Sequence, residues 1–187
     1  MEAVAPLRNG VNVDTLIGTI DAVKADADIA KFEFRAKTEW IDGGHCKTEI
    51  KNFFGAKTKD TSRTQTFVLE GDEPAVLLGS NQGVNAVEAV LHALASCLSV
   101  GFIYNAAALG ITVESLVFYT EGKLDLHAFL GLSDTKRAGY ESIQVTYDVK
   151  ADAPRAKLEE LCSYVQQTSP VLDILRNPVP VTISMAS

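Results

Sequence analysis

Asn85-Ala-Val-Glu-Ala-Val-Leu-His-Ala-Leu-Ala-Ser-Cys-Leu-Ser-Val-Gly101 is the stretch that decides the fold, because its apolar residues predict one long helix. Asn85 is expected to cap this helix and Glu88 to complete a capping box, while Gly110 is typical of a helix C-terminus. The apolar run reaches Leu109, but polar residues interrupt it, which indicates a core helix and not a membrane span. The thiol in the middle of this helix is the chain's first candidate for chemistry.

Alternating apolar and polar residues predict antiparallel strands on both sides of this helix. Asp42-Gly43-Gly44 is a turn, so the strands before and after it form a hairpin. An amphipathic helix capped by Asp14 precedes the hairpin, and a short helix begins at Ser169-Pro170 near the end of the chain. The expected elements are helices over 13–30, 154–166 and from 169, strands over 31–41, 46–54, 65–71, 111–126, 142–151 and 179–185, and a loop over 55–64. Together they predict an α+β fold.

The chain has 187 residues, of which 47% are hydrophobic, so it can bury a sizeable core as one domain or as two closely joined lobes. We expect a single domain over 1–187, with an N-terminal helical extension (1–30), an N-terminal sheet (31–80), and the central helix with a C-terminal α/β part (81–187).

Charge and composition exclude several classes of function. The net charge of -7 argues against a nucleic-acid partner, because binding to phosphates requires clustered Lys and Arg. The start of the chain, Met1-Glu-Ala-Val-Ala-Pro6, has neither the basic nor the apolar region of a signal peptide. With three widely spaced cysteines, this indicates a cytoplasmic protein without structural disulfides. We expect no membrane association.

The surroundings of Cys97 on its own helix are apolar. Ala93, Leu94, Gly101 and Tyr104 share its face, and apolar surroundings disfavour a thiolate. A reactive thiolate therefore needs a positive group or a hydrogen bond from another element.

Two other groups on the helix are poorly placed to activate this thiol. Glu88 is nine residues from Cys97 and on nearly the opposite side of an ideal helix, where a capping or surface role is an equal alternative. His92 is about 140° round the helix from Cys97, which makes it a weak candidate for a general base.

The remaining cysteines have unremarkable settings. Cys162 lies on the apolar face of a helix, where a core role is the simplest interpretation. Cys46 follows His45 on a strand, and this pair has no metal-site spacing to other ligands. Gly43-Gly44 opens no phosphate-binding loop, so we expect neither a metal nor an organic cofactor.

The chain resembles the OsmC/Ohr family, the osmotically inducible and organic-hydroperoxide-resistance proteins, over roughly residues 32–185. The residues that carry the resemblance are the helix from Asn85 to Leu98, Ala106-Ala-Ala-Leu-Gly-Ile111 after it, and Ser169-Pro-Val-Leu-Asp-Ile-Leu175. Glu121-Gly-Lys-Leu-Asp125 and a later Gly-Leu loop are most similar to the OsmC-like branch.

The resemblance implies curved antiparallel sheets wrapped around the long central helix in an intertwined homodimer. It also implies that Cys97 attacks a small hydrophobic peroxide as a thiolate, that a second cysteine resolves the sulfenic acid, and that an external dithiol is the reductant. Glu88 is then an orienting or charge-tuning group. Ser169 stands where the family has its second cysteine, and Cys162, two helical turns earlier, is the remaining candidate for a resolving thiol.

Three functions follow as alternatives. The first is a thiol-dependent peroxidase that reduces organic hydroperoxides through Cys97. The second is a stress-linked small-molecule binding protein with lost or altered redox activity, which the serine at position 169 favours. The third is an acyl hydrolase with Cys97 as nucleophile and His92 or His45 as base, a role that neither spacing demands.

Overall fold

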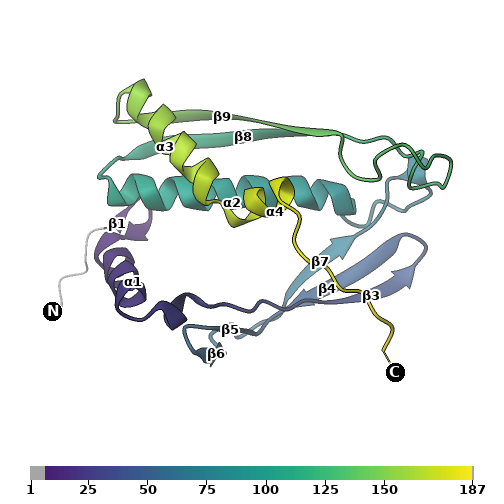
Figure 1. Ribbon diagram of the computed structural model, residues 1–187, viewed down its shortest axis with the longest axis horizontal. Helices are drawn as coiled ribbons and strands as arrows, with labels where there is room; N and C mark the ends of the chain where they lie inside the picture. Colours follow the sequence, from purple (N-terminus) through teal and green to yellow (C-terminus); the bar gives the residue numbers. More distant parts are fainter. Residues whose placement is uncertain (1–6, 187) are drawn as a thin grey trace. The chain divides into compact units, whose positions relative to one another are not determined.

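A computed structural model describes residues 7–186 (Figure 1). The chain divides into two compact units, Asp14–Val90 and the residues outside this range, with the boundary inside the long helix. The expected single domain over 1–187 stays a prediction, and the expectation for Met1-Glu-Ala-Val-Ala-Pro6 lies outside the described residues.

The unit Asp14–Val90 is built around a three-stranded antiparallel sheet in the order β3-β4-β7. Cys46, on the central strand, pairs with Trp40 on one side and with Gly71 on the other. The predicted hairpin and third strand are therefore confirmed, but the first strand begins at Lys37 instead of 31 and the second ends at Ile50 instead of 54. The elements of this unit are α1 (Val13–Ala25), a 3-10 helix η1 (Ala27–Ala30), β3 (Lys37–Asp42), β4 (His45–Ile50), β5 (Phe53–Gly55), β6 (Thr58–Asp60), β7 (Phe67–Gly71) and η2 (Ala75–Leu77).

Other expectations for this unit were wrong. The polar residues 55–64 are not all loop, because Thr58–Asp60 pairs with Phe53–Gly55 in a second hairpin. Its turn residues Ala56 and Lys57 both have positive φ, the geometry of a tight hairpin turn without the usual Asn-Gly signal. The first helix starts at Val13, so Asp14 lies in its first turn and is not its cap. The helix predicted over 13–30 ends at Ala25, and Ala27–Ala30 forms a separate 3-10 helix capped by Asp26.

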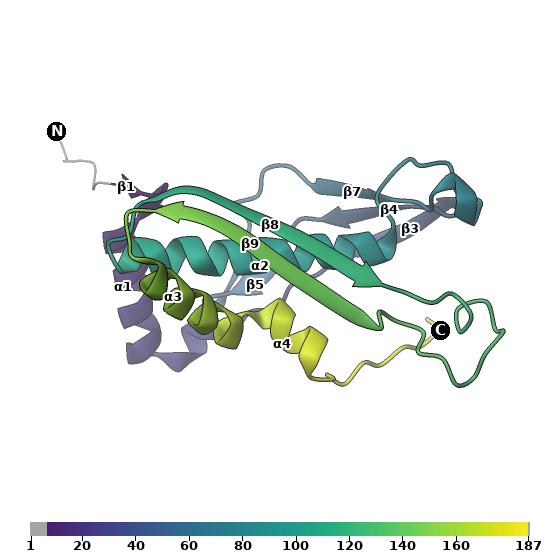
Figure 2. The same cartoon turned by 90° about the horizontal axis from the view of Figure 1, so that it is seen from above.

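The second unit packs helices against one long hairpin. β8 (Val113–Lys123) and β9 (Ser142–Ala151) pair antiparallel along their whole length. Figure 2 shows this hairpin running along α2 (Ala86–Ala108), with α3 (Arg155–Thr168) and α4 (Pro170–Arg176) beside it. The predicted strands over 111–126 and 142–151 and the helices from 154 and 169 are confirmed.

The buried core of this unit lies between α2, α3 and the inner face of the hairpin. On α2 the buried positions recur every four residues, at Leu94, Leu98, Phe102 and Ala106, so they form one stripe. The members from α3 are Leu158, Leu161, Cys162 and Val165. The expected core role of Cys162 is confirmed, whereas Cys97 lies at the edge of the α2 stripe and is half-buried.

The ends of α2 follow the sequence closely. The side chain of Asn85 accepts a hydrogen bond from the amide of Val87 at 2.8 Å, and Glu88 accepts one from the amide of Asn85 at 3.0 Å. Gly110 has φ of 77°, which only glycine adopts readily. The capping box and the terminal glycine are therefore confirmed. By length and composition alone, α2 is also the one described helix that could cross a membrane.

The start of the described chain is hydrogen-bonded to the residues that connect α2 to β8. β1 (Leu7–Arg8) and β2 (Val11–Asn12) form a small hairpin around Asn9. The Asn9 side chain donates to the carbonyl of Ile111 and accepts from the amide of Val113, both at 2.9 Å.

The predicted closing strand over 179–185 is wrong for this chain on its own. These residues form neither a helix nor a strand and pair with no described strand. Their alternating apolar side chains are exposed, up to 96% for Met185, because no other described part of the chain covers them. The exposed residues are Val179, Val181, Ile183 and Met185.

Candidate functional site

The sulfur of Cys97 receives a hydrogen bond from Ser169, whose hydroxyl lies 3.2 Å away. Cys97 sits in the middle of α2, and Ser169 is the residue between α3 and α4. The Ser169 side chain is 5% exposed, so this contact is shielded from water. The polar group that the sequence required from another element is therefore a neutral hydroxyl donor.

Ser169 is held in place by its role at the start of α4. Its hydroxyl oxygen accepts the amide hydrogen of Leu172 at 3.3 Å, and Pro170 occupies the first helical position. Because a serine hydroxyl accepts and donates at the same time, the cap leaves its hydrogen directed at Cys97. The Ser-Pro pair thus positions a donor at the thiol.

The approach of α2 to α3 fixes where Cys162 lies relative to Cys97. Gly101 faces Val165 so closely that an added Cβ would lie 3.1 Å from a methyl of Val165. Position 97 meets 169 and position 101 meets 165, so the helices run in opposite directions at this contact. Cys162 is seven residues before Ser169, about 10 Å further along α3. A disulfide needs Cα atoms within about 7 Å, so this placement makes a bond between Cys97 and Cys162 unfavourable.

Cys162 interacts with Tyr147 of β9. The Tyr147 hydroxyl donates to the Cys162 side chain, but burial raises the pKa of the Cys162 thiol and also that of Tyr147. Both side chains border an open groove of about 570 Å³ between β9 and the start of α3, which Leu158 and Ala153 also line. A resolving thiol must ionise to attack, and this environment keeps Cys162 protonated. Its resolving role stays a prediction.

Glu88 is used at the start of α2. Its carboxylate accepts a hydrogen bond from the backbone amide of Asn85, and the Asn85 side chain donates a hydrogen bond to the carboxylate of Glu73. The structure therefore shows the capping role that was one of its two alternatives. An additional role in tuning Cys97 stays a prediction.

The other candidate bases have partners of their own. His92 lies 3.5 Å from the hydroxyl of Ser96, one turn along α2, and His45 lies 2.9 Å from Glu70. Within residues 7–186, no three His, Cys, Asp or Glu side chains are grouped so that they could hold a metal ion.

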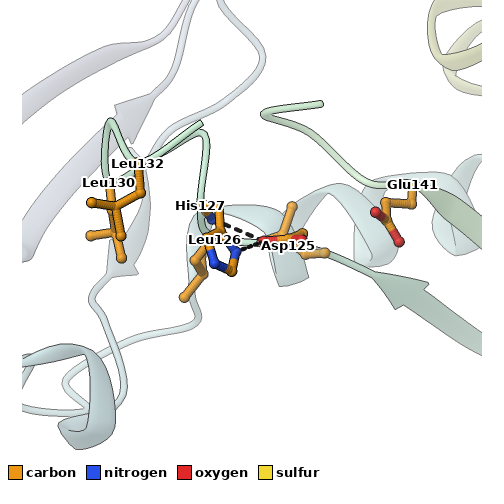
Figure 3. A pocket seen from close by; sticks show the side chains of 7 residues that line it. Asp125, Leu126, His127, Leu130, Leu132 and Glu141 are labelled. Atoms are coloured by element: carbon orange, nitrogen blue, oxygen red, sulfur yellow. Dashed lines mark hydrogen bonds and ion pairs between the residues drawn. The ribbon is translucent and has the colours of Figure 1, made fainter. Parts of the chain in front are cut away.

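The loop between β8 and β9 holds a charged pair that the sequence interpretation did not single out. Asp125 accepts hydrogen bonds from the backbone amide and the ring of His127, and it forms an ion pair with Lys136 at 3.1 Å. These contacts lower the pKa of Asp125, and the hydrogen bond from the amide of His127 has the largest effect. Figure 3 shows the pair in an open pocket of about 560 Å³ with Leu130, Leu132 and Glu141. The Asp-x-His spacing at the end of a strand was the available signal.

Comparison with known proteins identifies the fold and the family of this chain. No curated protein sequence matches the chain significantly. An OsmC-like protein from Mycoplasma pneumoniae is 14% identical with a TM-score of 0.59, and the match covers 78% of this chain and 89% of that one. An organic hydroperoxide resistance protein OsmC from Legionella pneumophila is 16% identical with a TM-score of 0.53, over 78% and 90% of the two chains.

An OsmC-like protein of unknown function from Vibrio cholerae is 16% identical with a TM-score of 0.51, over 75% of this chain and 92% of that one. At such identities these likenesses establish the fold, and they confirm the expected α+β, OsmC-like architecture. The sequence model of the OsmC-like protein family matches residues 79–184, which include α2, the long hairpin, α3 and α4. The chain therefore belongs to the OsmC-like protein family.

Proposed function

We propose that this protein is a thiol-dependent peroxidase that reduces organic hydroperoxides through Cys97. The observation that carries the proposal is the hydrogen bond from Ser169 to the Cys97 sulfur, because a donor aimed at sulfur stabilises negative charge there. Membership of the OsmC-like family and the likeness to a hydroperoxide resistance protein support the same chemistry.

The reaction consumes one hydroperoxide and two electrons. The Cys97 thiolate attacks the terminal oxygen of R–O–OH, the O–O bond breaks, and the alkoxide takes a proton to leave as an alcohol. The sulfur loses two electrons and becomes a sulfenic acid. An external thiol reductant then returns the two electrons, and water and the disulfide of the reductant are released.

The half-buried position of Cys97 favours a small hydrophobic peroxide. Its helix neighbours Ala93 and Gly101 are only partly buried and offer apolar contacts and no charge. An alkyl or aryl group gains by leaving water beside such residues, whereas hydrogen peroxide gains nothing. We therefore propose a preference for organic hydroperoxides over hydrogen peroxide.

The test is oxidation of the reduced protein by cumene hydroperoxide and by hydrogen peroxide, followed by dimedone labelling and mass spectrometry. We expect Cys97 to be labelled at least about 10-fold faster than free cysteine, which is only a few per cent thiolate at neutral pH. Cys97→Ser abolishes peroxide consumption, and Cys46→Ser, a change in the other compact unit, leaves it unchanged. If Cys97 reacts no faster than free cysteine, the peroxidase function is excluded.

One observation favours a second candidate, a small-molecule binding protein without turnover. The side chain against Cys97 is a hydroxyl, where an internal redox pair would need a second sulfur. This candidate predicts slow oxidation of Cys97 in the experiment above. It also predicts that an apolar hydroperoxide binds unchanged and can be recovered intact.

A further inference from the structure

Three cysteines are present, and their surroundings decide what can happen to an oxidised Cys97. The side chain that contacts the Cys97 sulfur is Ser169, which has no sulfur and cannot form a disulfide. An oxidised Cys97 would therefore meet a hydroxyl where an internal redox pair would need a second sulfur.

Cys162 is displaced from this place by the packing of the helices. The contact of Gly101 with Val165 lies between the two thiols, and Cys162 follows one further turn away. Cys162 is 6% exposed and accepts a hydrogen bond from the hydroxyl of Tyr147. For Cys162 to reach Cys97, α3 would have to unwind and a buried core residue would have to leave its cluster.

Cys46 belongs to the unit Asp14–Val90, on the central strand of the three-stranded sheet. Its sulfur is packed beside Gly71, where an added Cβ would lie 3.0 Å away. Neighbouring strands on both sides restrict its movement.

We propose that Cys97 is a single-cysteine redox centre whose sulfenic acid is resolved by a low-molecular-weight thiol from solution, with Ser169 holding the oxidised sulfur. This inference rests on the proposed peroxidase function and names the reductant class for the same site. Ser169 is a positioning residue: its hydroxyl donates to the sulfenic group, and the capped start of α4 keeps it there.

A small thiol suits the access to this sulfur. Cys97 is half-buried and Ser169 is buried, so the reacting atoms lie below the surface. A free thiol on a short flexible stem can enter such a site without moving a helix, whereas a cysteine on the rigid surface of a partner protein has to bring its backbone with it.

Two molecules of the small thiol are consumed in each turnover. The small thiol R–SH attacks the sulfenic sulfur of Cys97, forms an S–S bond and releases the hydroxyl group as water. A second R–SH attacks the sulfur of R in this mixed disulfide, Cys97 leaves as thiol, and R–S–S–R is released, so the two small thiols have supplied the two electrons that reduce Cys97. The product of one turnover is one disulfide of the small thiol.

The test compares wild type with Ser169→Cys. The Ser169 Oγ lies 3.2 Å from the Cys97 Sγ, so a sulfur at this position needs only a small shift to reach the S–S bond length of about 2.05 Å. Each protein is treated with one equivalent of cumene hydroperoxide, and thiols are counted after unfolding. Wild type is expected to lose one thiol per chain, to take up dimedone on Cys97, and to form a mixed disulfide there when glutathione replaces dimedone. Ser169→Cys is expected to lose two thiols, to take up little dimedone, and to show a peptide linkage from Cys97 to the introduced thiol.

The outcomes separate this inference from the function beneath it. No oxidation of Cys97 in wild type overturns the peroxidase function, and the inference with it. Fast oxidation followed by a disulfide from Cys97 to Cys162 or Cys46 in wild type overturns the inference alone. So does an oxidised wild type that thioredoxin reduces and glutathione does not. If Ser169→Cys does not fold, the wild-type thiol count and the glutathione adduct decide by themselves.

Discussion

The hydroxyl of Ser169 takes part in two hydrogen bonds at once, one to the backbone of α4 and one to the thiol on α2. A single side chain thus couples the stability of a helix start to the chemistry of Cys97. The two roles can be separated by experiment because stability and oxidation rate are measured independently.

Ser169→Ala is expected to lower the free energy of unfolding by about 1 to 2 kcal/mol, because both the cap and the bond to sulfur are lost. It is also expected to slow labelling of Cys97 after peroxide treatment. Urea denaturation and dimedone labelling measure the two effects. The matched control is Ser163→Ala on the exposed side of α3, which should change the free energy of unfolding by less than about 0.5 kcal/mol. Equal losses in both variants would contradict the role given to Ser169.

The buried thiol of Cys162 makes stability depend on alkaline pH. Because burial raises its pKa, the folded state keeps the proton that the unfolded state loses first. The free energy of unfolding is expected to be constant below about pH 8.5 and then to fall by up to about 1.4 kcal/mol per pH unit. Urea titrations from pH 7 to 10 measure this slope, which should be shallower in Cys162→Ala. A slope unaffected by that change would exclude Cys162 as its source.

At the scale of elements, the crossing of α2 and α3 positions both thiols. Gly101 allows the close approach, and the buried side chain of Val165 fills the space above it. The capping box of Asn85 and Glu88 fixes where α2 begins. These local features determine which residues of α2 face the junction of α3 and α4.

Gly101→Ala is expected to destabilise the protein by about 1 kcal/mol, because the strain of overpacking against buried Val165 exceeds the gain in helix propensity. Gly18→Ala on α1 is the matched control, since nothing lies within 4 Å of its added Cβ, and it should stabilise by about 0.5 to 1 kcal/mol. Thermal and urea unfolding give both values. Stabilisation by both substitutions would show that the helices do not touch at Gly101.

Glu88 can be tested as a cap and as a charge separately. Glu88→Ala removes the capping bond and is expected to cost about 1 kcal/mol in the free energy of unfolding, whereas Glu88→Gln keeps a capping acceptor and should cost less. If Glu88 also tunes Cys97, then Glu88→Gln slows peroxide reduction while the protein stays stable. Unchanged turnover in Glu88→Gln would limit this residue to its structural role.

At the scale of the whole molecule, two apolar surfaces have no partner within the described chain. Trp40 on β3 is 72% exposed, and Phe67 and Leu69 on β7 are also exposed. The extended segment after α4 presents Ile183, which is 91% exposed, and its alternating neighbours. Surfaces of this kind are typical of interaction sites, and a second copy of this chain is the partner that the resemblance implied.

We therefore predict a homodimer that the segment 179–185 helps to hold. The double variant Val181→Asp with Ile183→Asp is expected to halve the mass measured by light scattering at micromolar concentration, because charges enter an apolar contact. Thr182→Asp, on the alternate face of the segment, is the control and should leave the mass unchanged. A wild type that runs as a monomer would overturn the prediction.

Local signals allowed much of the fold to be predicted. Alternation located β8 and β9, and the capping residues located α2, because these patterns act over a few residues. The hairpin of β5 and β6 was missed because Ala56 and Lys57 lack the usual turn chemistry. The segment 179–185 has the pattern of a strand but depends on a neighbour that the described chain does not contain.

By itself, the sequence determined the long helix, its caps, the α+β class and the family, because these depend on periodicity and on residues close together in the chain. It also identified Cys97 as the reactive candidate and noted serine at position 169. Only the tertiary structure placed the Ser169 hydroxyl 3.2 Å from the Cys97 sulfur and the Tyr147 hydroxyl in a hydrogen bond with Cys162. Helix crossing and register bring together residues that are far apart in sequence. The partner of the thiol is therefore a property of packing, which no local pattern encodes.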